Sequence, residues 1–259
     1  MTHIEINKFS HLHNGKNIFF CKTDYLLSFF NYASSIDNEI VLITGNSDYS
    51  ITKDVFNLAP KNIKKWFAQN CDVQNDVITG IPMGLENTIE CKLKHHGKVW
   101  DHAIEKPIKI FSCQEVVPNK EIYANFSLNT HPSRSEVANI CKNLNYITCE
   151  ISNDHQTINN KSYELYSNNI KKHKMVVCPR GNGVDCHRIW EVLYLKRVPI
   201  VKKENQLKYF ESLPILFLDS WDELKNLELI NNKYNKVKFN KLNLAFFEHW
   251  ENIINNLAK

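Results

Sequence analysis

The chain has 259 residues, of which 43% are hydrophobic, and its formal net charge at neutral pH is +4. This composition excludes an intrinsically disordered protein, and the length allows one large domain or two small ones, each with its own core. The small net charge and the lack of a dense Lys/Arg run argue against nucleic acid as a partner.

The N-terminal residues lack the basic and apolar regions of a signal peptide, and no apolar run approaches the ~18 residues of a membrane-spanning helix. The eight cysteines contain no C-x-x-C pair and follow neither a zinc-site nor a disulfide-framework spacing. We therefore expect a soluble cytoplasmic protein without a transmembrane segment, whose thiols are reduced and mostly buried. For a viral protein, this compartment would be the host cytoplasm.

In the first half of the chain, short apolar runs alternate with helix-like segments, which is the pattern of a parallel α/β sheet. The expected strands are 17–21, 40–44 and 76–81, and the expected helices are 25–33 and 62–69. A further strand followed by a connector is expected over 107–120. We place a domain boundary near Pro118, so that residues 1–118 form the first domain.

The same pattern restarts in the second half and predicts a second domain over 119–259. The expected strands are 122–126, 146–149, 175–178, 199–201 and 215–218. The expected helices are 133–144, 162–171, 185–196, 221–229 and 242–257. Ser133 and Glu136 have the spacing of a capping box at the start of the first of these helices.

The segment KMVVCPRGNGVDCHRIWEVLYLKRVPIV (174–201) contains the most distinctive chemistry. Its first apolar run ends in a loop with Gly181 and Gly183, at the carboxyl end of a strand, where open α/β sheets bind ligands. The helix that follows offers free N–H groups and Arg188 to a phosphate or diphosphate. Glu191, one turn later, suits sugar or ribose hydroxyls; the alternative is an ordinary Arg188–Glu191 surface pair.

This loop matches neither a Walker A motif nor G-x-G-x-x-G. The run from 176 to 201 instead resembles the donor-site signature of exostosin-like glycosyltransferases (family 47-like), and the short viral and microbial members have the nearest layout. The other segments that agree in order are FFCKTDY (19–25), LITGNSDYSIT (42–52), IKKWFAQN (63–70), IPMGLEN (81–87) and YANFSLNTHPSR (123–134).

The resemblance implies an α/β protein with the GT-B fold, in which two Rossmann-like domains with parallel sheets face a central cleft. Residues 1–118 would be the acceptor side and 119–259 the nucleotide-sugar side, with a C-terminal helix able to pack back on the first domain. The implied donor-binding residues are Arg134, Arg180, Gly181, Asn182, Gly183, Arg188 and Glu191. The chain departs from the family at Lys196-Arg197, where members have a helix-ending Gly.

The implied reaction transfers a sugar from a nucleotide diphosphate sugar to a hydroxyl of a glycan or glycoconjugate acceptor. Arg/Lys side chains and a helix N-terminus would balance the charge of the leaving phosphates. The chain has no Asp-x-Asp motif, so we expect neither a metal nor another cofactor.

An inverting transfer needs a general base on the first domain, and Asp48 is the first candidate because it follows the strand 40–44. A plain turn residue is the alternative for Asp48. Further cleft candidates are Asp24, Glu86, His95 and His96. Asn125, Ser127 and Asn129, at the end of the strand 122–126, either line the cleft or cap the turn.

Two other classes of protein stay open. A nucleotide-sugar or carbohydrate-binding module on the same scaffold would keep the phosphate loop without a catalytic base. A nicotinamide oxidoreductase would need a phosphate fingerprint after the first strand, and CKTDY (21–25) offers none.

Overall fold

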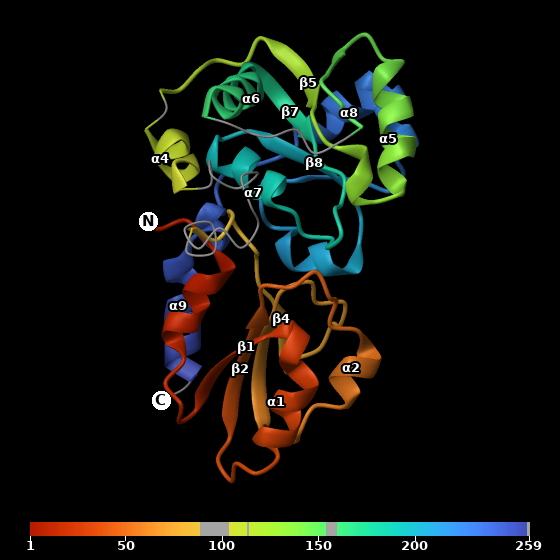
Figure 1. Ribbon diagram of the computed structural model, residues 1–259. Helices are drawn as coiled ribbons and strands as arrows, with labels where there is room; N and C mark the ends of the chain where they lie inside the picture. The colour runs from red at the N-terminus through yellow and green to blue at the C-terminus, as the bar shows by residue number, and fades with distance from the viewer. Residues whose placement is uncertain (89–103, 113, 154–159, 258–259) are drawn as a thin grey trace.

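The computed structural model describes residues 1–88, 104–112, 114–153 and 160–257. Within them the chain forms two parallel sheets, one in each half (Figure 1). The first sheet has the strand order β1-β2-β3-β4, and the second has the order β6-β5-β7-β8-β9. The protein is therefore of the α/β class, and both sheets are compatible with Rossmann-like domains.

The first sheet consists of strands that are apolar along most of their length, as expected for parallel strands covered on both faces. Its strands are β1 (Ile18–Lys22), β2 (Ile40–Gly45), β3 (Ile63–Ala68) and β4 (Ile78–Gly80). Helices α1 (Leu26–Ala33) and α2 (Lys53–Asn57) lie between them in the chain. The sequence did not predict α2, which is only a little more than one turn long.

The helix predicted over 62–69 is wrong, because this segment is the buried strand β3. Ile63, Trp66 and Phe67 have helical spacing, but the neighbouring aromatic side chains of β3 lie on opposite faces of the sheet. Trp66 packs edge-on against Phe30 of α1, with ring centroids 5.7 Å apart. Phe67 packs on the other face against Trp250, at 6.4 Å. Only a strand can bury two consecutive side chains in this way.

The second sheet lies where the sequence predicts it. Its strands are β5 (Lys120–Ala124), β6 (Ile147–Cys149), β7 (His173–Val177), β8 (Val198–Lys202) and β9 (Leu216–Leu218). The helices are α5 (Ser133–Lys142), α6 (Asn160–Lys172), α7 (His187–Tyr194) and α8 (Leu227–Tyr234). The predicted order of strands and helices in this half is confirmed, with ends that differ by a few residues.

The strand predicted over 107–120 is wrong in its first part, which forms helix α4 (Lys106–Phe111). Pro107 occupies the first turn of α4, where its missing N–H costs nothing because that position has no intrahelical partner. Residues 114–119 belong to neither a helix nor a strand, and β5 begins at Lys120.

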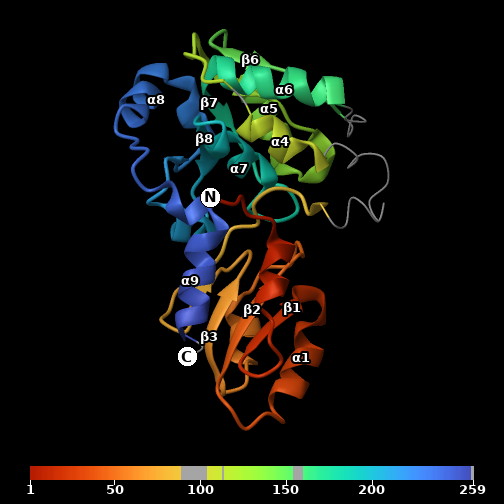
Figure 2. The same ribbon diagram turned by 90° about the vertical axis from the view of Figure 1, so that its left-hand side faces the viewer.

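Helix α9 (Phe247–Leu257) returns to the first sheet from the far end of the chain (Figures 1 and 2). Its Trp250 and Ile254 are buried in one apolar cluster with Val41 and Phe67. The C-terminal helix therefore supplies the cover for one face of the first sheet. Among the residues that the structure describes, none of the helices combines the length and apolar character needed to traverse a lipid bilayer.

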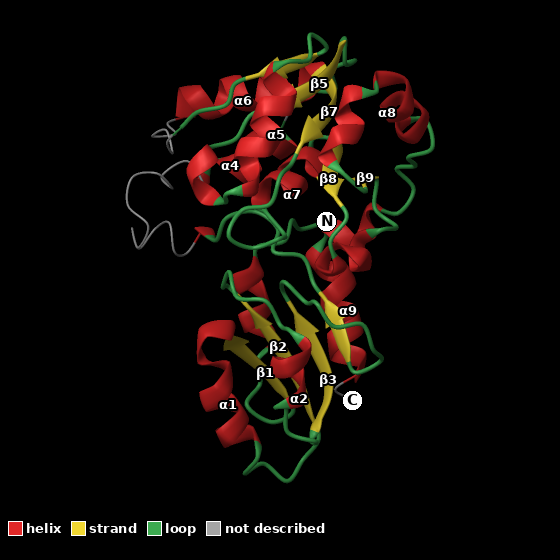
Figure 3. Cartoon of the chain, turned by 90° about the vertical axis from the view of Figure 1, so that its right-hand side faces the viewer, coloured by secondary structure: helices red, strands yellow, loops and turns green. Residues whose placement is uncertain are grey.

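The strands of both sheets point their carboxyl ends at each other (Figure 3). Asn70, which follows β3, accepts a hydrogen bond of 3.2 Å from the backbone N–H of Asp185, which follows β7. Asp48, which follows β2, accepts a hydrogen bond of 3.3 Å from the Asn182 side chain. We call this contact between the two halves the seam. It is formed by segments 45–48, 69–71 and 81–87 of the first half and by segment 180–187 of the second half.

Helix α7 ends in a left-handed turn at Lys196, whose φ is 56°. The Arg197 N–H donates to the Val192 carbonyl, at 2.9 Å, which closes the helix as a glycine turn would. The Arg197 guanidinium donates to the Lys171 carbonyl at the end of α6. Lys196 and Arg197, which stand where the family has a helix-ending glycine, thus keep the turn, and Arg197 also caps the end of α6.

Because a Cβ in this conformation costs about 1 kcal/mol, Lys196→Gly should raise the free energy of unfolding by about 0.5–1 kcal/mol. The ion pair between Lys196 and Glu115 contributes little to the free energy of unfolding, because both side chains are exposed to solvent. Chemical denaturation measures the change. Lys196→Ala, which keeps the Cβ, should give no gain; an equal gain from both variants would contradict backbone strain as the cause.

Candidate functional site

A cavity of about 230 Å³ opens at the carboxyl ends of β7 and β8. It lies between the loop after β7, the start of α5 and the segment after β8. The charged and polar side chains that line it are His131, Ser133, Glu136, Arg180, Lys202 and Glu204. This is the edge at which open parallel sheets bind ligands, so the cavity and its neighbouring loop form the candidate site.

The predicted capping box at α5 is wrong, and this changes the cavity. Pro132 takes the N-cap position and makes no side-chain cap bond. The Ser133 hydroxyl lies 2.7 Å from Nδ1 of His131 instead. The Glu136 side chain is therefore not used in helix capping and lines the cavity.

The two glycines of the loop lie close to neighbouring side chains. A Cβ on Gly183 would lie 2.8 Å from Nδ2 of Asn70, on the other side of the seam. A Cβ on Gly181 would lie 3.2 Å from the Thr130 methyl group and 3.5 Å from the Arg134 guanidinium. A side chain at position 183 would therefore force the Asn70 amide to shift, whereas one at position 181 would need only a small adjustment of Thr130.

Arg134 is buried beneath this loop, and its contacts are to neutral groups. Its guanidinium donates to the Arg180 carbonyl at 2.7 Å, to the Ser127 carbonyl at 2.8 Å and to the Thr130 hydroxyl at 3.0 Å. Burial, and then the nearby charge of Arg188, lowers the pKa of Arg134 to about 10. The predicted donor residue therefore shapes the loop and adds positive potential to it.

Arg188, in the first turn of α7, has a buried Nε without a hydrogen-bond partner in the described part of the chain. Buried polar groups in native proteins are nearly always paired, so this guanidinium N–H is a candidate contact for a bound water or a ligand. Arg134 lies against Gly181, and Arg188 is near enough to Arg134 for its charge to lower the pKa of that guanidinium. This favours an anion at that point.

Glu191 is in a different environment from the predicted one. Its Oε1 accepts a bond of 2.5 Å from Lys106 of α4, and its Oε2 accepts a bond of 2.7 Å from the Tyr166 hydroxyl of α6. Lys106 also pairs with Glu86, and all three charged side chains are buried. We call Glu86, Lys106 and Glu191 the ionic triad.

Charge pairing outweighs desolvation in the ionic triad. Burial raises the pKa of Glu86, but the charge of Lys106, the nearby His187 and the hydrogen bond from Lys106 together bring that pKa down to about 2. Burial likewise disfavours the Lys106 ammonium, yet Glu191 and Glu86 hold its pKa above the ordinary value. Glu86 and Lys106 therefore carry their charge, and in this structure Glu191 makes its bonds inside the protein.

The candidate base Asp48 lies at the seam. Its side chain is exposed and its Oδ2 accepts the bond from Asn182 of the glycine loop. Arg180, next to this loop, donates to the Asn182 carbonyl at 3.0 Å and lines the cavity. The structure thus brings Asp48, Asn182 and Arg180 to one end of the cavity loop.

The remaining candidates lie elsewhere. The Asn125 amide bonds to Tyr123 and Glu150, and Asp24 pairs at 3.8 Å with Lys22 at the surface. Asn129 is exposed. Ser127 supplies its carbonyl to Arg134, while its own buried hydroxyl has no partner among the described residues. Glu86 belongs to the ionic triad. His95 and His96 lie outside the described residues.

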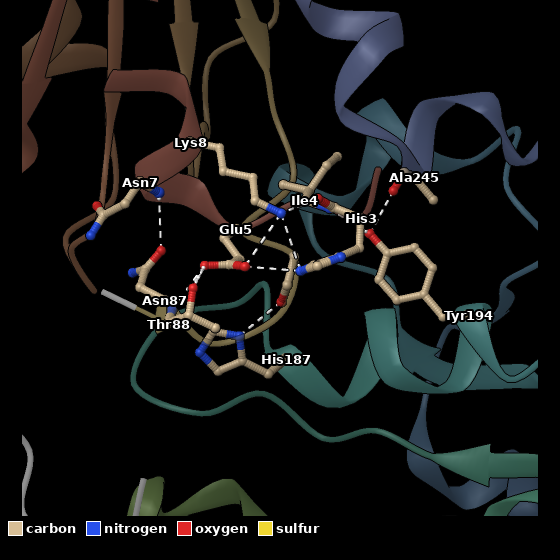
Figure 4. Close-up of polar contacts among 11 residues, drawn as sticks. His3, Ile4, Glu5, Asn7, Lys8, Asn87, Thr88, His187, Tyr194 and Ala245 are labelled. Carbon is tan, nitrogen blue, oxygen red and sulfur yellow. Dashed lines mark hydrogen bonds and ion pairs between the residues drawn. The ribbon is translucent and has the colours of Figure 1, made fainter. Parts of the chain in front are cut away.

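The N-terminal segment helps to hold the seam (Figure 4). The buried Glu5 carboxylate accepts bonds of 2.8 and 2.7 Å from the backbone and hydroxyl of Thr88, and lies 2.9 Å from the His3 ring. Burial raises the pKa of Glu5, but these hydrogen bonds from His3 and Thr88 bring it down to about 2.

Helix α7 joins the same contact region. The Tyr194 hydroxyl accepts from the Ile4 N–H at 3.0 Å and donates to the Ala245 carbonyl at 2.5 Å (Figure 4). His187 lies 2.8 Å from the Gly84 carbonyl. The helix that carries Arg188 is therefore anchored at both ends to segments of the first half and of the C-terminal region.

Asp185, in the loop before α7, is a second buried carboxylate at the seam. It accepts bonds of 2.7 Å from the Met83 N–H and 2.6 Å from the Trp190 ring N–H. Burial raises the pKa of Asp185 to about 7. In the unfolded chain this proton is held only below about pH 4.

The folded state therefore binds the Asp185 proton more tightly, and this contribution to stability is complete below pH 4 and is lost as the pH rises through 7. Between pH 5 and 8, the free energy of unfolding of the wild type should fall by about 2–3 kcal/mol more than that of Asp185→Asn. Denaturant titrations of both proteins at pH 5 and at pH 8 measure the fall in the free energy of unfolding of each. An equal fall in the two proteins would contradict the raised pKa of Asp185.

Several residues of the site were missed by the sequence analysis, among them His131, Lys202 and Glu204 of the cavity, and also Asn70 and Lys106. Asn70 was overlooked because the segment before it was interpreted as a helix, so Asn70 was not placed at a strand end. Lys106 was overlooked because its partners lie 20 and 85 residues away. Within the described ranges, no group of three or more His, Cys, Asp or Glu side chains is placed to hold a metal ion.

The fold and the site together define an α/β protein with two opposed parallel sheets and a cationic glycine loop between them. In comparisons with known proteins, no protein-family model and no curated sequence matches the chain. The function is therefore inferred from the site itself and from the resemblance of its motifs.

Proposed function

We propose that the protein is a metal-independent, inverting glycosyltransferase of the GT-B fold, which uses a nucleotide diphosphate sugar as donor. The observation that carries this proposal is that the carboxyl ends of the two sheets face each other, with a glycine loop, the buried Arg134 and the half-buried Arg188 at that point. A donor bound to one sheet then meets an acceptor bound to the other. The exostosin-like motifs occur in the same order along the chain.

The diphosphate would lie against Gly181–Gly183, where Arg188 can donate its free Nε–H to a phosphate oxygen. Arg134 contributes positive potential from below the loop. The nucleoside would occupy the neighbouring cavity, in which Glu136 and Glu204 offer carboxylates to hydroxyl or base N–H donors. These two carboxylates replace Glu191 in that role, because both oxygens of Glu191 are already bonded.

In the proposed reaction, Asp48 accepts the proton of the acceptor hydroxyl as its oxygen attacks the anomeric carbon. The bond from that carbon to the phosphate oxygen breaks, and the nucleoside diphosphate leaves with the electron pair. Arg188 and Arg134 stabilise the negative charge that develops on the leaving phosphates. No cofactor takes part in these steps.

The proposal is tested by titrating nucleoside diphosphates and their sugar conjugates and following thermal stabilisation. At least one nucleotide should bind, and Arg188→Gln should weaken it by about 100-fold, because a charge-assisted hydrogen bond to phosphate is lost. Arg188→Lys should keep part of the affinity, and Lys53→Gln, an exposed change on α2, should keep all of it. Equal binding by Arg188→Gln and the wild type would reject the site.

A non-catalytic nucleotide-sugar or carbohydrate-binding module is the second candidate. The observation that favours it is the position of Glu191. Both carboxylate oxygens of Glu191 are bonded within the protein, so the contact that the resemblance implies between this residue and the donor is not made. A module of this kind would bind the same donor without consuming it.

A further inference from the structure

A second hollow, separate from the candidate site, lies beside the edge strand β9. It has a volume of about 570 Å³ and is formed by β9, the segment before it, and the segment that follows α8. Among the residues that line it are five lysines and a single carboxylate, Glu211. The lysines are Lys203, Lys233, Lys236, Lys238 and Lys241. We call this hollow the lysine groove.

Part of this positive charge has no counter-charge in the protein. Lys203 pairs with Asp219 at 2.7 Å, and Lys233 pairs with Glu223 at 2.5 Å. Lys236, Lys238 and Lys241 are exposed, and none of the ion pairs of the described residues includes them. The groove therefore presents an uncompensated cationic edge, although the whole chain carries only +4.

An exposed aromatic residue lies in the same segment of the chain as three of these lysines. Phe239 is 41% exposed, between Lys238 and Lys241 in the chain. A polyanion without rings, such as heparin, needs the lysines alone and gains nothing from an exposed Phe, whereas single-stranded nucleic acid can stack a base on it. A membrane surface uses both groups, because lysines attract anionic headgroups while an aromatic ring enters the boundary with the acyl chains.

From this combination we propose that the lysine groove and Phe239 bind the surface of an anionic phospholipid membrane. The segment between α8 and α9 runs along the outside of the second half, where a flat surface can reach it (Figure 2). Lys202 lines the candidate cavity and the adjacent Lys203 lines the groove.

The test is co-sedimentation of the full chain with vesicles of phosphatidylcholine alone or with 30% phosphatidylserine, at about 0.1 M salt. The wild type should bind only the anionic vesicles. Lys236→Glu, Lys238→Glu and Lys241→Glu combined should weaken that binding by at least about 100-fold. Phe239→Ser alone should weaken it by about tenfold. Unchanged melting temperatures show that both variants are folded.

The matched control reverses the same charge on the first half, with Lys16→Glu, Lys53→Glu and Lys61→Glu combined; these side chains are also exposed. This variant should bind the vesicles much better than the groove variant. Equal loss in both triple variants would show an effect of net charge only and overturn the proposal. Binding to heparin or single-stranded DNA but not to vesicles, or an unchanged affinity of Phe239→Ser, would overturn it as well. None of these results depends on nucleotide-sugar chemistry.

Discussion

Replacing Lys106 by Met should lower the free energy of unfolding by about 3–5 kcal/mol, the largest effect on stability that we expect from a single change. Lys106 is the shared partner of two buried carboxylates, and its removal leaves Glu86 and Glu191 facing each other without a cation. Both would then take up protons or draw in water. Denaturant titration measures the loss, which should be greater at high pH, where protonation is more costly.

Two further variants separate this effect from a loss of packing. Lys109→Met changes the same residue type in the same helix, where the lysine pairs with Glu105 at the surface, and should cost less than about 1 kcal/mol. Adding Glu86→Gln and Glu191→Gln to Lys106→Met removes the buried charges and should restore most of the stability. If the triple variant is as unstable as Lys106→Met, the charge argument is wrong.

Replacing Asp48 by Asn should slow sugar transfer by about 100- to 10,000-fold, the range over which a general base acts. Donor affinity should change by less than about threefold, because Asp48 is proposed to contact the acceptor and not the diphosphate. The rate under donor saturation and the donor Kd, measured in parallel, separate these two quantities.

The control for this prediction is Asp54→Asn, which removes an exposed carboxylate from the first turn of α2. Its rate should equal that of the wild type. An unchanged rate in Asp48→Asn would leave Asp48 as a turn residue that holds Asn182 across the seam.

The second half of the fold could be predicted from the sequence because its signals are local. Strands such as β7 are apolar from end to end, and the loop that follows contains the glycines that end such a strand. Because ligands of open α/β sheets bind at strand ends, the loop around Gly181 could be singled out without a structure.

The first half was harder because its core depends on a distant segment. Strand β3 is covered on one face by Trp250 of α9, and nothing near Phe67 in the chain indicates this cover. Without it, the spacing of Ile63, Trp66 and Phe67 fits an amphipathic helix equally well. Recognition of β3 would have placed Asn70 at a strand end and at the seam.

The environment of Glu191 could not be predicted for a related reason. The spacing of Arg188 and Glu191 describes one helix face, but not what packs against it. Lys106 and Tyr166 come from two other helices and occupy both carboxylate oxygens. A surface pair and a sugar contact were the two expectations, and the structure shows a buried ionic triad.

Incubation of the full chain with a panel of nucleotide diphosphate sugars, in the presence of a metal chelator, tests the central claim most directly. Mass spectrometry would follow loss of the donor and release of the nucleoside diphosphate. We predict that at least one donor is consumed by hydrolysis or transfer, and that Asp48→Asn binds this donor but consumes it at least 100-fold more slowly. A donor that binds and is never consumed would contradict catalysis and leave a binding module. Consumption that stops reversibly on chelation would contradict the metal-independent mechanism.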